Sequence, residues 1–158
     1  MTDLVQHAKG LADSARDALL KTLMSVPDEK LTWSPSATAR SALGIAAHAG
    51  VSNRAFAGII RGKGMPDLPM DELVQQMVAA EAAITSREQA VGLIQQTTAA
   101  VHAALDALTP ELVSSLVETP MMTQPMTLFM VLPGIHMYAH AAQIDYVETV
   151  WGDMESHI

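Results

Sequence analysis

Hydrophobic residues recur at steps of three and four along most of the chain, the spacing of one face of an α-helix. The first stripe predicts a helix from about Asp3 to Met24. Its members are Leu4, Ala8, Leu11, Ala15, Ala18, Leu19 and Leu23. The stretch VPDEKLTWSPS then breaks the pattern. Ser34 followed by Pro35 is typical of a helix N-cap with proline in the first turn, so a second helix is expected from about Pro35 to Arg61.

Two further helical stretches follow in the middle of the chain. The loop GKGMPDLP, rich in glycine and proline, precedes MDELVQQMVAAEAA, which predicts a shorter helix. Thr85 and Glu88 then form a capping-box pattern. It opens the most regular stripe in the sequence, which predicts a long helix reaching Leu108.

The remainder of the chain predicts one irregular segment and one long helix. Residues 110–125 contain three prolines and are expected to be irregular, with a short extended piece near residues 116–119. The last helix is expected from about Met126 to Trp151, with a kink at Pro133 and Gly134.

These patterns predict an all-α protein with four long helices and a shorter one. The length of 158 residues is that of one domain, expected to span residues 1–158. Hydrophobic residues make up 49% of the chain and aromatic residues only 4%, a composition that suits packed helices better than sheets. A four-helix bundle is the expected fold.

Charge and cysteine content narrow the classes of function. The net charge of -8 argues against nucleic acid or an anionic membrane surface as the main partner. There is no cysteine, which excludes disulfides, thiolate metal sites and a cysteine nucleophile. The N-terminus lacks the pattern of a signal peptide, and no apolar run is long enough to cross a membrane. A cytoplasmic protein is expected.

Candidate chemistry lies in the last predicted helix, where His136 and His140 are four residues apart. At about 100° per residue, they share a face with Gln143 and Val147, whereas Asp145 points away from it. Two imidazoles one turn apart can chelate one metal ion. A surface pair, or buried rings with local hydrogen bonds, is the structural alternative.

A third histidine, His48, lies midway along the second predicted helix. Its helical neighbours are small or apolar, so its ring is expected to point inward. An inward histidine is often only a core residue. Together with His136 and His140, however, it would complete a three-nitrogen site, and three protein ligands with an open position are typical of a catalytic metal.

Other metal sites are disfavoured. Met137 follows His136 where the H-E-x-x-H motif needs glutamate, and no glutamate is followed by histidine three residues later, as di-iron bundles require. His7, His102 and His157 are expected at the surface or at the edge of a stripe. The 11 methionines are expected to fill the core, and a haem site is disfavoured by the low aromatic content.

A resemblance to a known family rests on the order of these features. His48 follows the L-T-W-x-P stretch at Leu31–Pro35, with Ser41 between them. The later motif H-x-x-x-H-x-x-Q-[IL]-D-Y is formed by His136, His140, Gln143, Ile144, Asp145 and Tyr146. Trp151, Gly152 and Asp153 follow it. In this arrangement the chain resembles the DinB/YfiT-like superfamily.

The resemblance implies an up-down-down-up four-helix bundle that binds a divalent metal, commonly nickel or zinc. It implies that His48, His136 and His140 are the metal ligands and that the protein is a homodimer. Characterised members include thiol-dependent isomerases and S-transferases, while many members have no assigned activity.

Three functional hypotheses follow. The first is a metal-dependent transferase, isomerase or hydrolase that acts on a small molecule, with a low-molecular-weight thiol that the metal activates as a candidate co-substrate. Under this hypothesis, Gln143 orients substrate or water. The second is a non-catalytic module that binds a metal or small ligand in a stress response. The third is a structural bundle without a metal.

Overall fold

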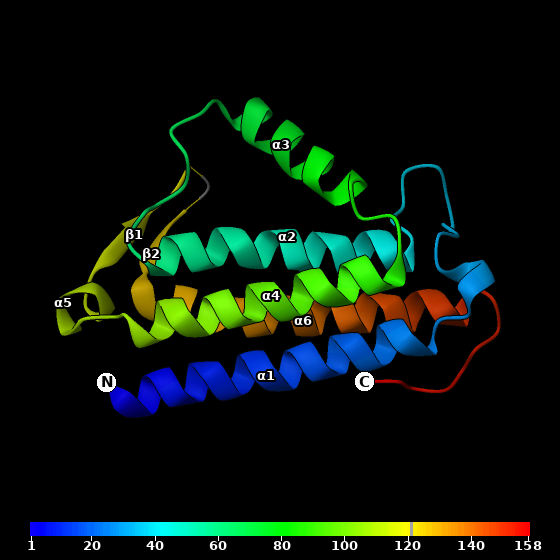
Figure 1. The fold of residues 1–158 in the computed structure, drawn as a ribbon, viewed down its shortest axis with the longest axis horizontal. Helices are drawn as coiled ribbons and strands as arrows, with labels where there is room; N and C mark the ends of the chain where they lie inside the picture. Colours follow the sequence, from blue (N-terminus) through cyan, green and yellow to red (C-terminus); the bar gives the residue numbers. More distant parts are fainter. Residues whose placement is uncertain (121) are drawn as a thin grey trace.

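Four long helices lie side by side and form the body of the molecule (Figure 1). The computed structural model describes residues 1–120 and 122–158. The long helices are α1 (Thr2–Ser25), α2 (Ala42–Ile60), α4 (Arg87–Asp106) and α6 (Met126–Thr149). In Figure 1, α1 and α6 run from left to right, whereas α2 and α4 run from right to left. The predicted all-α bundle is confirmed.

Shorter elements connect the long helices. A turn of 3₁₀-helix, η1 (Asp28–Lys30), follows α1, and α3 (Met70–Ala82) lies on the outer side of α2 (Figure 1). After α4 come α5 (Pro110–Val113) and a small antiparallel pair, β1 (Leu116–Glu118) with β2 (Thr123–Pro125). The extended piece predicted near residues 116–119 is therefore confirmed, and its partner strand is an addition. Among the described residues, no helix has the length and apolarity to cross a membrane.

The core lies between the four long helices. Its largest fully buried side chains come from every one of them and include Leu19, Ile60, Ile94, Leu105, Phe129 and Ile144. The methionines divide between core and surface. Met126, Met130 and Met137 are buried, but Met24 and Met154 are 60% and 80% exposed. The prediction that methionine fills the core is therefore wrong for part of the set.

The second helix begins at Ala42, later than the predicted start at Pro35. Its N-cap is Ser41, whose hydroxyl accepts a hydrogen bond from the backbone N–H of Gly44 at 3.1 Å. The hydroxyl of Ser34 instead donates to backbone carbonyls within the preceding loop. Both serines satisfy the local cap rule, and the tertiary path of the loop decides between them.

That loop crosses one end of the bundle and brings two distant parts of the sequence together. The ring of Trp33 packs edge-on against Trp151, with a centroid separation of 5.4 Å. The backbone N–H of Leu43 donates to the carbonyl of Leu31 at 3.0 Å. The loop is thus anchored to the start of α2 and to the chain just after α6.

The start of α4 also differs from the predicted cap. Ser86 is the N-cap, and its hydroxyl accepts from the backbone N–H of Gln89. The Gln89 side chain in turn accepts from the backbone N–H of Thr85 at 2.7 Å. The capping pair is therefore Ser86 with Gln89, one residue beyond the predicted Thr85 and Glu88, because glutamine serves this role as well as glutamate.

Two buried glycines let the long helices approach closely. A Cβ at Gly50 of α2 would lie 2.7 Å from the Leu93 side chain of α4. A Cβ at Gly134 of α6 would lie 2.6 Å from Cγ of Leu11 and 3.0 Å from its backbone carbonyl carbon. Helix α6 continues through Pro133 and Gly134 from Met126 to Thr149.

We expect Gly134→Ala to lower the free energy of unfolding by about 1–3 kcal/mol, because the added methyl group must displace the backbone of α1. Urea denaturation measures this change. Gly10→Ala is the matched control, since a Cβ there meets nothing within 4 Å; it should raise stability by about 0.5–1 kcal/mol. Equal stability of Gly134→Ala and the wild type would contradict the close contact.

Candidate metal centre

The three histidines singled out in the sequence meet between α2 and α6. His48 comes from the middle of α2, and His136 and His140 lie one turn apart on α6. One ring nitrogen from each can be chosen so that all three lie within 4.8 Å of one another. The ring centroids of His136 and His140 are 4.2 Å apart, and that of His48 lies 4.9 Å from His140. The structure thus brings the predicted set together.

Glu81 fixes the orientation of the His48 ring. Its carboxylate lies 2.7 Å from Nδ1 of His48, a distance at which the Nδ1–H donates to Oε1. The other carboxylate oxygen accepts from the guanidinium of Arg40 at 3.2 Å. Because the proton resides on Nδ1, the lone pair of His48 is on Nε2. A carboxylate behind a histidine is a common arrangement in metal sites.

Gln143 does the same for His140. The side-chain oxygen of Gln143 lies 2.7 Å from Nδ1 of His140, so the Nδ1–H donates to it. The lone pair of His140 is then on Nε2, which faces Nε2 of His136 at 3.0 Å. Gln143 was predicted to orient substrate or water, and its contact in the structure is with a ligand candidate.

The ring of His136 is enclosed by side chains from both helices. Its Nδ1 is buried and has no hydrogen-bond partner among the described residues. Its Nε2 faces that of His140, and its ring packs edge-on against Phe56. Metal–imidazole bonds of about 2.0–2.1 Å place neighbouring nitrogens about 2.9–3.4 Å apart, depending on the coordination geometry. The donor set and the observed spacing therefore fit a divalent cation.

Burial disfavours the charged form of His136 and His140. Desolvation, followed by the charges of His140 and His48, lowers the pKa of His136 from 6.5 to about 3. Desolvation also lowers the pKa of His140, although the hydrogen bond to Gln143 opposes the shift. Neutral imidazole is the form that binds metal, and the lowered pKa of His136 and His140 favours that form in both rings.

A cavity of about 460 Å³ opens beside the histidines. Its walls include Arg40 and Gln143, the side chains that contact Glu81 and His140. The other lining residues are Pro35, Thr38, Ala39, Ile45, Ala139, Ala142, Tyr146 and Val147. A volume of this order accommodates a small organic ligand.

A second cavity of about 460 Å³ lies between α2 and α3. Its lining is mainly apolar, with Arg54 and Lys63 as charged members. Neither cavity is lined by one of the three histidines. The cavity beside Arg40 and Gln143 is the one associated with the centre, because these two side chains contact Glu81 and His140.

The remaining histidines differ in their surroundings. His7 is exposed, as predicted. His102 is partly buried, with Nε2 3.2 Å from the carboxylate of Asp13. His157 was predicted at the surface, but its side chain is only 18% exposed and lies against Asp153 and Glu148. This prediction is wrong because the chain after α6 folds back onto the bundle.

Two contributors to the centre were not foreseen from the sequence. Glu81 lies on α3, and Arg40 lies in the loop before α2. Neither residue is part of a sequence motif that pairs it with a histidine. The one signal for Glu81 is an acidic residue near the end of a weakly patterned helix, and it does not point to His48.

Comparisons with known proteins support the fold. A family model described as the DinB superfamily matches residues 11–144. The structure of a mycothiol-dependent maleylpyruvate isomerase is similar with a TM-score of 0.72 and 14% identity, over 89% of this chain and 60% of that one. The chain thus spans 60% of the length of the isomerase.

A protein named Sibling Lethal Factor Precursor, DfsB, gives a TM-score of 0.68 and 15% identity, over 94% of this chain and 97% of that one. No curated protein matches the sequence. At these identities the structural likeness establishes the fold.

The low pKa of His136 makes stability depend on pH. The unfolded chain takes up a proton near pH 6.5, whereas the folded chain resists it down to about pH 3. The contribution of neutral His136 to the free energy of unfolding is therefore fully present above pH 6.5 and decreases as the pH is lowered below it. The decrease is at most about 1.4 kcal/mol per pH unit for one such group.

We expect His136→Asn to reduce the loss of stability of the metal-free protein between about pH 7.5 and pH 5 by up to about 2 kcal/mol. Urea denaturation at the two pH values measures this difference. His7→Asn, at an exposed histidine, should leave the pH dependence as in the wild type. An unchanged dependence in His136→Asn would show that this imidazole is not desolvated.

Proposed function

This chain belongs to the DinB superfamily, and we propose that it is an enzyme that uses a divalent metal held by His48, His136 and His140. The observation that carries the proposal is the set of hydrogen bonds behind the rings. Glu81 and Gln143 occupy the Nδ1 atoms of His48 and His140, which directs both Nε2 lone pairs toward one point. A bundle core needs no such convergence of unprotonated nitrogens.

The cation proposed is nickel or zinc, since imidazole ligands suit both. Three neutral ligands leave the full positive charge on the ion. When bound, it would lower the pKa of a coordinated thiol or water and so supply a nucleophile at neutral pH. Glu81 and Gln143 would hold the ligand rings in place while the reactants exchange.

The substrate proposed is a small molecule that enters the cavity lined by Arg40 and Gln143, together with a low-molecular-weight thiol. The chain has no cysteine, so a thiol must come from outside. A fold neighbour is a mycothiol-dependent isomerase. The Arg40 guanidinium, with its side chain 49% exposed, is available to pair with an anionic group of either reactant.

The reaction class is transfer or addition of the thiol to an electrophilic carbon. The new carbon–sulfur bond forms as the sulfur gives its electron pair to that carbon. In an S-transferase a leaving group departs with the electrons of its bond. In an isomerase the sulfur is expelled again after rotation about the substrate bond. The described residues add no nucleophile of their own to this scheme.

The proposal predicts about one nickel or zinc ion per chain in protein purified without an affinity tag, measured by plasma mass spectrometry. His48→Ala and His140→Ala should each lower the content at least tenfold, because two imidazoles bind far more weakly than three. His7→Ala is the control and should retain the wild-type content. Failure of the wild type to bind any added divalent metal would refute the proposed centre.

Activity is tested on the same proteins with mycothiol, bacillithiol or glutathione and a panel of electrophiles. Thiol consumption should require both the metal and an intact His140. A fully loaded wild type that binds thiols without turnover would instead favour the non-catalytic binding module.

We expect Glu81→Gln to weaken metal affinity by about 10–100-fold, because an amide polarises the His48 ring less than a carboxylate does. Glu72→Gln removes the same charge from the exposed first turn of α3 and is the matched control. Competition with a chromogenic chelator measures both affinities. Equal affinities would show that Glu81 serves only to dock α3.

A further inference from the structure

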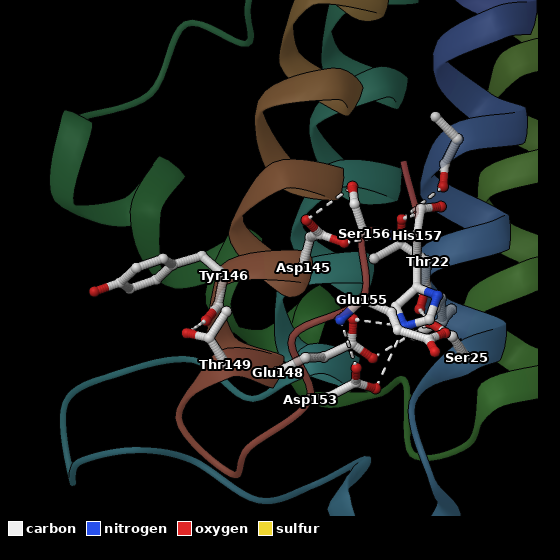
Figure 2. Close-up of polar contacts among 12 residues, drawn as sticks. Thr22, Ser25, Asp145, Tyr146, Glu148, Thr149, Asp153, Glu155, Ser156 and His157 are labelled. Atoms are coloured by element: carbon white, nitrogen blue, oxygen red, sulfur yellow. Dashed lines mark hydrogen bonds and ion pairs between the residues drawn. The ribbon is translucent and has the colours of Figure 1, made fainter.

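A second group of metal-ligating side chains lies where α6 ends. Glu148 belongs to the last turn of α6, and Asp153 and His157 belong to the chain that follows it. Figure 2 shows this chain turning back so that the His157 ring lies next to both carboxylates. One ligand atom from each of the three residues can be chosen so that all lie within 4.8 Å of one another.

Backbone hydrogen bonds deliver His157 to this place. Gly152 adopts a positive φ of 97°, which reverses the chain after α6. The backbone N–H of His157 then donates to the Asp145 carboxylate at 2.6 Å, and its carbonyl accepts from the hydroxyl of Thr22 at 3.4 Å. The tail therefore lies between α6 and α1, with its imidazole directed at the end of α6 (Figure 2).

The buried carboxylate of Glu148 is the feature that calls for a ligand. Glu148 is 0% exposed, and one of its carboxylate oxygens, Oε1, accepts a hydrogen bond from the hydroxyl of Ser25 at 3.2 Å. The other oxygen, Oε2, is buried without a hydrogen-bond partner among the described residues. A buried carboxylate oxygen left in this state costs free energy unless a cation or a donor meets it.

The imidazole of His157 does not meet that need. Its Nε2 lies 3.3 Å from the carboxylate of Asp153 but 4.0 Å from Oε2 of Glu148. One ring N–H donates effectively to one acceptor, and Asp153 is the nearer. Oε2 of Glu148 thus points into the group without a donor at hydrogen-bond distance.

We propose that Glu148, Asp153 and His157 form a second divalent-cation site that fastens the C-terminal tail to the bundle. Two carboxylates balance the charge of the ion, and the imidazole supplies the nitrogen ligand. One nitrogen and two oxygens suit Zn²⁺ or Mn²⁺. Bonds of about 2.0–2.2 Å in a tetrahedral site separate ligand atoms by about 3.4 Å, close to the observed 3.3 Å and 4.0 Å.

This site shares no residue with the three-histidine centre. Its ligands come from one helix end and one tail, so it acts on the position of the tail. The competing arrangement is a protonated His157 that forms an ion pair with both carboxylates and leaves no place for a cation. The two arrangements differ in whether added metal is bound.

The test is a calorimetric titration with Zn²⁺ of the His136→Ala/His140→Ala protein, in which the first centre is removed. One ion per chain is expected. Adding His157→Ala or Asp153→Asn should weaken binding at least tenfold. Glu155→Gln is the matched control, because it removes an exposed tail carboxylate outside the group, and it should leave the affinity unchanged.

Absence of binding at millimolar Zn²⁺ in the parent double-alanine protein would overturn the proposal. So would an affinity in the His157→Ala and Asp153→Asn proteins equal to that of this parent. If the double-alanine background fails to fold, as circular dichroism would show, the wild type is titrated instead. Its capacity should then fall by one ion per chain in His157→Ala, and an unchanged capacity would refute the site.

Fastening of the tail has its own readout. Release of Ile158 by a serine carboxypeptidase should be at least tenfold slower with Zn²⁺ than without it, and the His157→Ala protein should show no such protection. Cleavage at the same rate with bound Zn²⁺ would overturn the role given to the tail. When the experiment is done on the His136→Ala/His140→Ala protein, which lacks the first centre, neither result depends on the proposed enzyme function.

Discussion

The rings of His136 and His140 pack against each other in a partly buried space, where positive charge is disfavoured. This constraint governs the centre between α2 and α6. It lowers the pKa of His136 and His140, and it makes the position of each ring proton a matter of the hydrogen bonds behind the ring. Glu81 and Gln143 accept hydrogen bonds from the Nδ1–H groups of His48 and His140. The Nε2 atoms of both rings therefore keep a free electron pair. The chemistry available to the site follows from that division.

The helices that carry none of the three histidines still determine where these candidate ligands lie. Gly134 stands two residues before His136 and packs directly on Leu11 of α1. Gly50 stands two residues after His48 and packs on Leu93 of α4. Both α2 and α6 thus pack closely against a neighbouring helix near their histidines. A larger side chain at either glycine would shift the helix close to its histidine. The geometry of the centre therefore depends on the close packing of the bundle at these two glycines.

Hydrophobic spacing predicted the long helices well, because each packs apolar residues against its neighbours. Helix α2 does so on most of its faces, where ten of the residues 42–53 are buried. The i, i+4 pair of histidines and the inward position of His48 were also accessible, since helix geometry alone fixes which residues share a face. The start of α2 could not be predicted from the sequence, because Ser34 and Ser41 are equally good N-caps until the path of the loop is known. Glu81 and His157 were inaccessible for a related reason: each reaches its partners through a turn whose direction no local pattern encodes.

Helix α3 is the least anchored of the longer helices, and it carries Glu81. Within it Leu73 is the buried residue, while Val74 and Val78 face solvent. Such a segment belongs to the low end of the range of local opening free energies that hydrogen exchange detects. Because Glu81 contacts His48 only while α3 is docked, docking would be coupled to the proposed metal binding, and each would strengthen the other by the same factor. An ion bound at the histidines would thus be felt as slower amide exchange in a helix that provides it with no ligand.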